Sequence, residues 1–255
     1  MEMNLKGKNV VVTGAARGIG REICAGFTGV QATVIGVDFR DMAETESYLR
    51  GSQAGCRFEK FSVDLADPAS VEKGCSAILA RFSTVDVLVN DGALWGGLKI
   101  TPLDKIPAEE WDRVININVR GTYLMIKGLL SGLRKSQGSV INMASSAALR
   151  GSPGCLHYAT SKGAIIGMTR SLASELGAEG IRVNAIAPSL VDNEASRQFG
   201  GEKFPKMLEG TVAAQCLHTP LVEKEIVGTV LYLASALAAP ITGVLLTVDK
   251  GLIKY

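Results

Sequence analysis

The sequence predicts an α/β fold, a doubly wound parallel sheet formed by a single domain over residues 1–255. First, short β-branched runs alternate with longer helix-compatible segments almost throughout, which is typical of parallel strands joined by helical crossovers. Second, the 255 residues are 47% hydrophobic, 20% charged and only 5% aromatic, so an aliphatic core is expected. Third, no repeat, linker or composition shift marks a second domain.

The first strand is expected at Asn9–Thr13, a β-branched run that ends at Gly14 and is followed by apolar residues at helical spacing. The next three strands are expected at residues 32–37, 57–63 and 86–90. Before the last of these, Pro68 stands where a first helical turn tolerates proline, and apolar positions on one helical face follow it. Strands and helices are therefore expected to alternate in this part of the chain.

A long helix is expected at residues 108–133, where Trp111, Ile115, Val119 and Tyr123 form one stripe. Further along, strands are expected at Ser139–Met143 and at 182–187, with a helix at 158–177 between them. The polar stretch at 189–217 has no strand signal, and we expect it to be a lid over a substrate site.

Residues 226–248 carry no charge and are long enough to span a bilayer. Pro240, Thr242 and Gly243 interrupt this stretch, and a β-branched run follows them. A helix, a turn and a buried strand are therefore expected here in place of a membrane span.

The charge balance is close to neutral, because 27 Lys and Arg residues face 25 Asp and Glu, which gives +2. This predicts no nucleic-acid partner. The five cysteines are widely separated and form no CxxC pair, so neither a disulfide framework nor a metal site is expected, and a reducing, cytoplasmic compartment is favoured. Residues 1–8 are charged and no small-residue cleavage site follows them, so we expect no signal peptide.

A glycine-rich turn lies between the first strand and the first helix, where backbone amides can approach a pyrophosphate. Its residues include Gly14, Arg17, Gly18, Ile19 and Gly20. A tight turn used only for packing would be the alternative.

The second strand ends at Asp38, whose carboxylate can accept hydrogen bonds from ribose hydroxyls and would repel a 2′-phosphate. NAD is therefore expected over NADP, although Arg17 and Arg40 could compensate a phosphate charge. The alternative for Asp38 is a solvated strand end or a helix cap.

Tyr158 and Lys162 are four residues apart, which places them on one helical face. A nearby ammonium favours the tyrosinate form, so such a tyrosine can serve as an acid or base toward an alcohol or carbonyl oxygen. Ser145 stands thirteen residues before Tyr158, and Asn118 lies in the preceding helical segment. Taken singly, these residues have simpler explanations, such as loop polarity for Ser145 and a helix-bending hydrogen bond for Asn118.

Together, the TGxxxGIG loop, Asp64-Leu65, Asn118, Ser145, Tyr158-x-x-x-Lys162 and the run from Arg182 to Pro188 resemble the short-chain dehydrogenase/reductase (SDR) family across essentially the whole chain. The resemblance implies a seven-stranded Rossmann-type sheet and a homotetramer or homodimer. It also implies hydride exchange between a nicotinamide and a carbonyl or secondary alcohol.

The same resemblance implies a role for each matching residue. Tyr158 would be the general acid/base, Ser145 would bind the substrate oxygen, Lys162 would lower the Tyr158 pKa and hold the nicotinamide ribose, and Asn118 would position a proton-relaying water. The implied cofactor-binding residues are Gly14, Arg17, Gly18, Ile19, Gly20, Asp38, Phe39, Asp64, Leu65, Asn90, Gly92, Tyr158, Lys162, Pro188, Val191 and Asn193.

The sequence also departs from the family pattern. Asn90-Asp91-Gly92-Ala93 stands where the family usually reads Asn-Asn-Ala-Gly, which puts loop geometry and NAD affinity in doubt. Gln31 replaces a usual glycine before the second strand, and Lys250 replaces a glycine near the C-terminus. None of these changes removes one of the four catalytic residues.

The residues expected around the substrate are Ser145, Trp95, Ala147, Cys155, His157 and Tyr158. Apolar residues of the expected lid, Phe204, Met207 and Leu208, are added to these. The set as a whole is mostly apolar, which favours a neutral, apolar or aromatic secondary alcohol or ketone, although His157 could equally be a packing residue. One alternative is a 3-oxoacyl thioester reductase that uses NADPH, with Arg150 recruiting an anionic carrier group. An alternative of another class is a non-catalytic nucleotide-sensing scaffold. Enoyl reductases of the family place Tyr and Lys farther apart, and extended sugar epimerases need a larger C-terminal domain.

Overall fold

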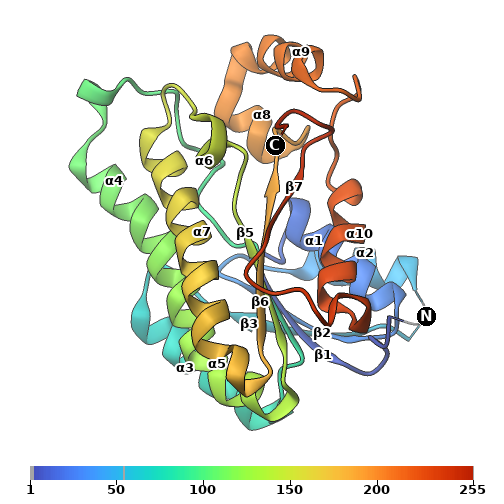
Figure 1. Cartoon of the computed structure of the whole chain (residues 1–255). Helices are drawn as coiled ribbons and strands as arrows, with labels where there is room; N and C mark the ends of the chain where they lie inside the picture. The colour runs from blue at the N-terminus through green and yellow to red at the C-terminus, as the bar shows by residue number, and fades with distance from the viewer. Residues whose placement is uncertain (1–2, 54, 255) are drawn as a thin grey trace.

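Seven parallel strands form the centre of the molecule in the computed structural model, which describes residues 3–53 and 55–254 (Figure 1). The strands are β1 Asn9–Thr13, β2 Thr33–Asp38, β3 Arg57–Ser62, β4 Val87–Asn90, β5 Ser139–Met143, β6 Arg182–Pro188 and β7 Leu245–Val248. Their order in the sheet is β3-β2-β1-β4-β5-β6-β7. The chain thus winds outward in both directions from β1 and β4, which confirms the predicted doubly wound sheet.

Helices cover both faces of this sheet (Figure 1). The helices are α1 Gly18–Gly29, α2 Ala43–Ser52, α3 Pro68–Phe82, α4 Ala108–Ile115, α5 Thr122–Ser136, α6 Ala147–Arg150, α7 Leu156–Leu176, α8 Glu194–Gly200, α9 Phe204–Ala214 and α10 Lys224–Ala234. Short 3₁₀ turns lie at Leu103–Lys105, Gly177–Glu179, Gly201–Lys203 and Ala236–Ala238. Helices α1, α2 and α10 pack on one face, and α3, α5 and α7 pack on the other.

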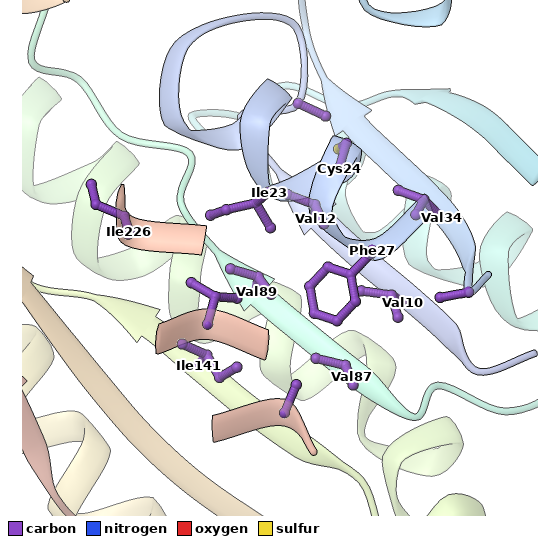
Figure 2. Close-up of a cluster of buried hydrophobic side chains, with 14 of the residues drawn as sticks. Val10, Val12, Ile23, Cys24, Phe27, Val34, Val87, Val89, Ile141 and Ile226 are labelled. Atoms are coloured by element: carbon purple, nitrogen blue, oxygen red, sulfur yellow. The ribbon is translucent and has the colours of Figure 1, made fainter. Parts of the chain in front are cut away.

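Alternating side chains on each strand feed two separate cores. Val10 and Val12 of β1 point into the core under α1 and α10, whereas Val11 between them points to the core under α3 and α5. Figure 2 shows the first of these clusters, where Phe27 of α1 packs beside Val10 and Val87. Because both faces of the central strands are buried, β1 and β4 consist mainly of consecutive apolar residues, whereas β3, at one edge of the sheet, alternates with charged residues.

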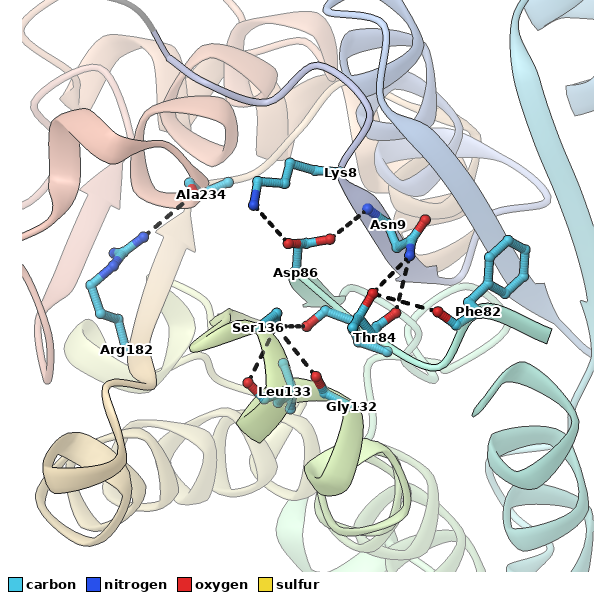
Figure 3. Close-up of polar contacts among 11 residues, drawn as sticks. Lys8, Asn9, Phe82, Thr84, Asp86, Gly132, Leu133, Ser136, Arg182 and Ala234 are labelled. Atoms are coloured by element: carbon cyan, nitrogen blue, oxygen red, sulfur yellow. Dashed lines mark hydrogen bonds and ion pairs between the residues drawn. The ribbon is translucent and has the colours of Figure 1, made fainter. Parts of the chain in front are cut away.

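Polar contacts fasten the amino-terminal edge of the sheet (Figure 3). The Asp86 carboxylate, just before β4, accepts hydrogen bonds from Lys8 Nζ at 2.8 Å and from the Asn9 amide at 2.9 Å. The Ser136 hydroxyl donates to the carbonyl of Val85 at 2.5 Å. These bonds tie β1, β4 and α5 together at the amino ends of the strands. The opposite end of the sheet, where the carboxyl ends of the strands lie, does not contain them.

The long helix predicted at residues 108–133 is interrupted. A π-helical segment at Asn116–Gly121 separates α4 from α5, and the Thr122 hydroxyl donates to the Asn118 carbonyl at 2.9 Å. Apolar periodicity could not reveal this segment, because the stripe of Trp111, Ile115, Val119 and Tyr123 continues through it. Such π segments occur often at functional sites.

The uncharged C-terminal stretch folds as the predicted helix, turn and strand, namely α10, the 3₁₀ turn at Ala236–Ala238, and β7. The expectation that its strand is buried was wrong. β7 is the last strand in the sheet order, and Leu246 on it is 38% exposed. No helix in the described part of the chain is both long and apolar enough to cross a membrane.

Candidate functional site

A cavity of about 760 Å³ opens at the carboxyl ends of the strands, beside the point between β1 and β4 where the winding direction reverses. This is the position where open α/β sheets bind their ligands. Its walls come from the glycine loop, the ends of β2, β4, β5 and β6, and the segment from α8 to α9. The predicted residues in its lining are Gly14, Arg17, Gly18, Ile19, Asp38, Phe39, Asp64, Leu65, Gly92, Trp95, Ser145, Ala147, Tyr158, Lys162, Pro188, Val191 and Asn193.

The glycine loop is shaped by two residues with left-handed backbone angles, Gly14 at φ +73° and Gly18 at φ +59°. Gly20 has no room for a side chain, because a Cβ there would lie 2.1 Å from the Gly14 carbonyl oxygen. The loop therefore folds back tightly onto the first turn of α1 and brings backbone amides to the cavity. This geometry suits a pyrophosphate at a helix N-terminus.

The Asp38 carboxylate is held at the carboxyl end of β2 by backbone donors. Its Oδ2 accepts from the Ala16 amide at 3.0 Å, and its Oδ1 accepts from the Arg40 amide at 3.0 Å. Phe39, beside it, is 63% exposed and lines the same part of the cavity. A fixed carboxylate with free lone pairs at this position can accept the hydroxyls of a ribose.

Asn90 occupies a different place from the one expected. It lies inside the sheet and is 4% exposed, and its side-chain amide donates to Asn142 Oδ1 of β5 at 2.9 Å. Asn90 is absent from the cavity lining, whereas its neighbour Gly92 lines the cavity and donates its amide to the Thr13 hydroxyl at 2.9 Å. Asn90 thus links β4 to β5 below the site.

Tyr158 and Ser145 both line the cavity. Tyr158 lies in the first turn of α7 and is 9% exposed, while Ser145 follows β5. Burial raises the pKa of the Tyr158 phenol above its usual value, and the nearby Ser145 hydroxyl opposes that rise. The structure therefore brings the predicted tyrosine and serine to one cavity, with Ser145 as the group that favours the tyrosinate.

Lys162 lies one turn further along α7, with its Nζ 5.7 Å from the centre of the Tyr158 ring. The ammonium donates to the Met143 carbonyl at 2.6 Å and is 4% exposed. Burial lowers the pKa of Lys162, and the Asp91 carboxylate raises it. The largest influences on the Tyr158 pKa are burial, which raises it, and Ser145, which lowers it. The sequence-based prediction assigned the lowering of this pKa to Lys162 and did not include the effect of Ser145.

Asn118 is 2% exposed and lies behind the cavity wall, in the π-helical segment. Its Oδ1 accepts from the Leu94 amide at 2.7 Å, and its Nδ2 donates to the Ser161 hydroxyl at 3.0 Å. Asn118 thereby connects the loop after β4 to the helix that carries Tyr158. In this structure the side chain holds protein groups together.

Two of the residues expected around the substrate face away from the cavity. The ring of His157 is fully buried, accepts the Tyr158 amide at Nδ1 and lies 3.0 Å from the Glu110 carboxylate of α4 through Nε2. Cys155 is also fully buried, and its Sγ lies 2.7 Å from the Ser152 hydroxyl. Both residues secure the start of α7 and do not line the cavity.

Phe199 of α8 is a cavity residue that sequence reasoning missed. The Trp95 indole lies between Tyr158 and Phe199, with ring centroids 4.4 Å and 4.0 Å away. Its Nε1 donates to the Ser196 hydroxyl at 3.3 Å. An ion pair of 3.1 Å between Arg17 Nη1 and Glu194 also joins the glycine loop to α8. The residues in these contacts are distant from one another in the sequence, so no local sequence pattern predicts the contacts.

No three His, Cys, Asp or Glu side chains gather into a metal-binding group within residues 3–53 and 55–254. All five cysteines are free thiols. The cavity wall presents the Tyr158 phenol, the Ser145 hydroxyl and the Lys162 ammonium beside the glycine loop.

A family model described as enoyl-(acyl carrier protein) reductase matches residues 14–253. The 3-oxoacyl-(acyl-carrier-protein) reductase FabG of Vibrio cholerae is 34% identical over 251 residues, which cover 98% of this chain and 99% of that protein. D-threitol dehydrogenase of Mycolicibacterium smegmatis is 32% identical over 252 residues, which cover 98% and 94%.

Among solved structures, the crystal structure of a ribose-5-phosphate isomerase from Brucella melitensis 16M matches with a TM-score of 0.87 and 32% identity, covering 97% of this chain and 93% of that one. The names of these similar proteins state different activities, so the likeness does not select a substrate.

Proposed function

Because the chain belongs to the short-chain dehydrogenase/reductase family of NAD(P)-linked oxidoreductases, we propose that it transfers a hydride between NAD and a neutral, apolar or aromatic secondary alcohol or ketone. The observation that carries the proposal is that Tyr158 and Ser145 line the same dinucleotide-sized cavity, with the Lys162 ammonium one turn away from the tyrosine. A bound nicotinamide would accept or supply the hydride.

Tyr158 exchanges a proton with the substrate oxygen in the proposed reaction. In the oxidation direction its phenolate oxygen takes the proton of the substrate hydroxyl, and in the reduction direction its phenol gives a proton to the carbonyl oxygen. The Ser145 hydroxyl binds the same substrate oxygen and stabilises negative charge as it develops there. The Lys162 ammonium adds a positive charge 5.7 Å from the ring, which favours the ionised phenol.

NAD is proposed over NADP because of the Asp38 carboxylate. Its oxygens are fixed by the amides of Ala16 and Arg40, so it cannot turn away from a bound adenosine ribose. A 2′-phosphate at that position would face a negative charge at close range, which is unfavourable.

The apolar character of the proposed substrate follows from the aromatic and aliphatic part of the cavity lining. Trp95, Ala147, Phe199 and Met207 line the cavity, and residues 189–217 are proposed to act as its lid. Aromatic and aliphatic surfaces of this kind bind apolar groups by burial.

A 3-oxoacyl thioester reductase is the second candidate, because FabG of Vibrio cholerae is 34% identical over almost the whole chain. Arg150 and Lys206 in the cavity lining could attract an anionic carrier group. A nucleotide-sensing scaffold without turnover is the third candidate, and the assembled Tyr158, Ser145 and Lys162 argue against it.

We also propose a homodimer or homotetramer. Apolar side chains at the β7 edge and on α10 support it, since Val244, Leu246 and Tyr232 are 39%, 38% and 37% exposed. Light scattering after size-exclusion chromatography tests this, and a monomer at micromolar concentration would contradict it.

The function is tested with a panel of secondary alcohols, ketones and a 3-oxoacyl thioester, each assayed with NAD(H) and NADP(H) by nicotinamide absorbance. Tyr158→Phe is expected to abolish turnover while NAD binding persists, and Tyr123→Phe, on an exposed part of α5, is the matched control. Full turnover in Tyr158→Phe would remove the phenol from the mechanism. Activity only on the thioester would select the second candidate, and binding of NAD without any turnover would select the scaffold.

A further inference from the structure

Asp91 follows β4 directly and stands at the centre of the carboxyl edge of the sheet. The register pairs Asn90 with Thr13 of β1 on one side and with Asn142 of β5 on the other. Asp91 is therefore flanked by the next residues of those strands, Gly14 and Met143. This position joins the glycine loop to the strand whose end receives Lys162.

The Asp91 carboxylate is packed against the glycine loop. A Cβ added at Gly20 would lie 3.0 Å from Asp91 Oδ2, and one added at Gly14 would lie 3.2 Å from it. Asp91 also lines the cavity. Its carboxylate therefore lies at the cavity floor, in close contact with the glycine loop.

Lys162 reaches the same floor from α7. Its ammonium is 4% exposed and donates to the carbonyl of Met143, the β5 residue that flanks Asp91. A buried ammonium needs a nearby opposite charge to remain ionised. Among the described residues no ion pair within 4.0 Å joins Lys162 to Asp91, although both side chains line the same cavity. Their charges can therefore act on each other only over a longer distance.

The charged and titratable groups around Asp91 come from three elements. Lys162 and Tyr158 face it from α7, Asp38 faces it from the end of β2, and Cys24 faces it from α1. Burial raises the pKa of Asp91, and the Lys162 charge lowers it. In return, the Asp91 charge raises the pKa of Lys162 against the effect of burial. Each group therefore favours the ionised form of the other.

We propose that Asp91 is a positioning residue of the active site, whose carboxylate packs against the glycine loop and supplies the counter-charge that keeps the buried Lys162 ammonium protonated. This inference rests on the proposed function, in which the Lys162 charge supports the ionised Tyr158. An asparagine at position 91 could still pack against the glycine loop, but its side chain is neutral and would provide no negative charge near Lys162.

The test is a pH titration of Lys162 in the full-length protein, followed by NMR of lysine labelled with ¹³C at Cε. The Lys162 signal is assigned by its loss in Lys162→Met. In Asp91→Asn the midpoint of this signal is expected to move to lower pH by about one unit or more, because an opposite charge has been removed from a buried site. Asp91→Ala should move the Lys162 midpoint in the same direction, and it replaces Asp91→Asn in the test if the asparagine variant folds poorly.

Asp86→Asn is the matched control. Asp86 lies at the amino end of the same strand, bonded to Lys8 and Asn9 (Figure 3), so its loss should leave the Lys162 midpoint unchanged. An unchanged midpoint in Asp91→Asn, or an equal shift in Asp86→Asn, would overturn the counter-charge. The readout needs no turnover, so it stands apart from the Tyr158→Phe assay, which decides the proposed function.

Discussion

The Trp95 indole stacks on the Phe199 ring, with their centroids 4.0 Å apart and their planes 27° apart. Trp95 belongs to the loop after β4, and Phe199 belongs to α8 in the segment proposed as a lid. Because the same indole also packs on Tyr158, the Trp95 side chain connects the proposed lid to the proposed acid/base residue. Changes in lid position are therefore expected to reach Tyr158 through Trp95.

Phe199→Ala is expected to raise the KM for the organic substrate roughly fivefold, because an aromatic pair contributes about 1 kcal/mol. The steady-state assay that measures this is paired with fluorescence in a Trp111→Phe background, which leaves Trp95 as the remaining tryptophan. Its emission should move to longer wavelength when Phe199 is removed. Leu208→Ala is the control, since Leu208 lines a separate groove with Pro205 and Val212. Equal effects of both variants would contradict a specific role of the stack.

Asp38→Ser is expected to reverse the cofactor preference. Loss of a charged acceptor for the ribose should lower kcat/KM for NAD by roughly tenfold or more, and loss of the repulsion should raise it for NADP. The measurement is kcat/KM with each cofactor at a fixed substrate concentration. Asp41→Ser serves as the control, because Asp41 is nearby in sequence and absent from the cavity lining. A wild-type protein that already prefers NADP would refute the argument from Asp38.

Gln31→Gly is expected to stabilise the protein by about 0.5–1 kcal/mol. Gln31 is exposed and has φ +61°, a left-handed conformation that costs a side-chain-bearing residue about 1 kcal/mol and costs glycine little. Thermal unfolding should show a Tm higher by roughly 2–4 °C. Gln53→Gly is the matched control: its φ of −150° needs no glycine, so its Tm should fall. A lower Tm for Gln31→Gly would mean that the glutamine side chain stabilises the fold by more than its left-handed backbone conformation costs.

The departure at Lys250 has a local explanation. Lys250 also has a left-handed backbone, at φ +55°, and its Nζ lies 2.6 Å from the Glu225 carboxylate at the start of α10. The expected glycine is thus replaced by a residue that gains an ion pair within its own chain.

Local features explain what could be predicted. The strands are recognisable because apolar runs buried on both faces leave no polar position, as in Val10 to Val12. The glycine loop is recognisable because left-handed angles at Gly14 and Gly18 require that residue type. Tyr158 and Lys162 could be paired because helical spacing alone puts positions four apart on one face.

The remaining features depend on elements that are distant in the chain. His157 turns away from the cavity because Glu110 of α4 receives its ring, and the helical pattern of α7 carries no sign of that partner. The break at Asn116–Gly121 follows from bonds that join Asn118 to Leu94 and Ser161. The edge position of β7 follows from the order of strands, which the apolar content of that strand does not encode.

The sequence alone predicted the doubly wound fold, which the structure confirms, and it identified the glycine loop and the Tyr158–Lys162 pair as candidates, since each depends on residue types at short, fixed spacings. Only the tertiary structure decided which side chains surround that pair. Parallel register places Asp91 between Gly14 and Met143, and the packing of α8 places Phe199 on Trp95. The physical reason is that charge and stacking act over a few ångströms in space, whereas the residues involved are separated along the chain by whole strands and helices.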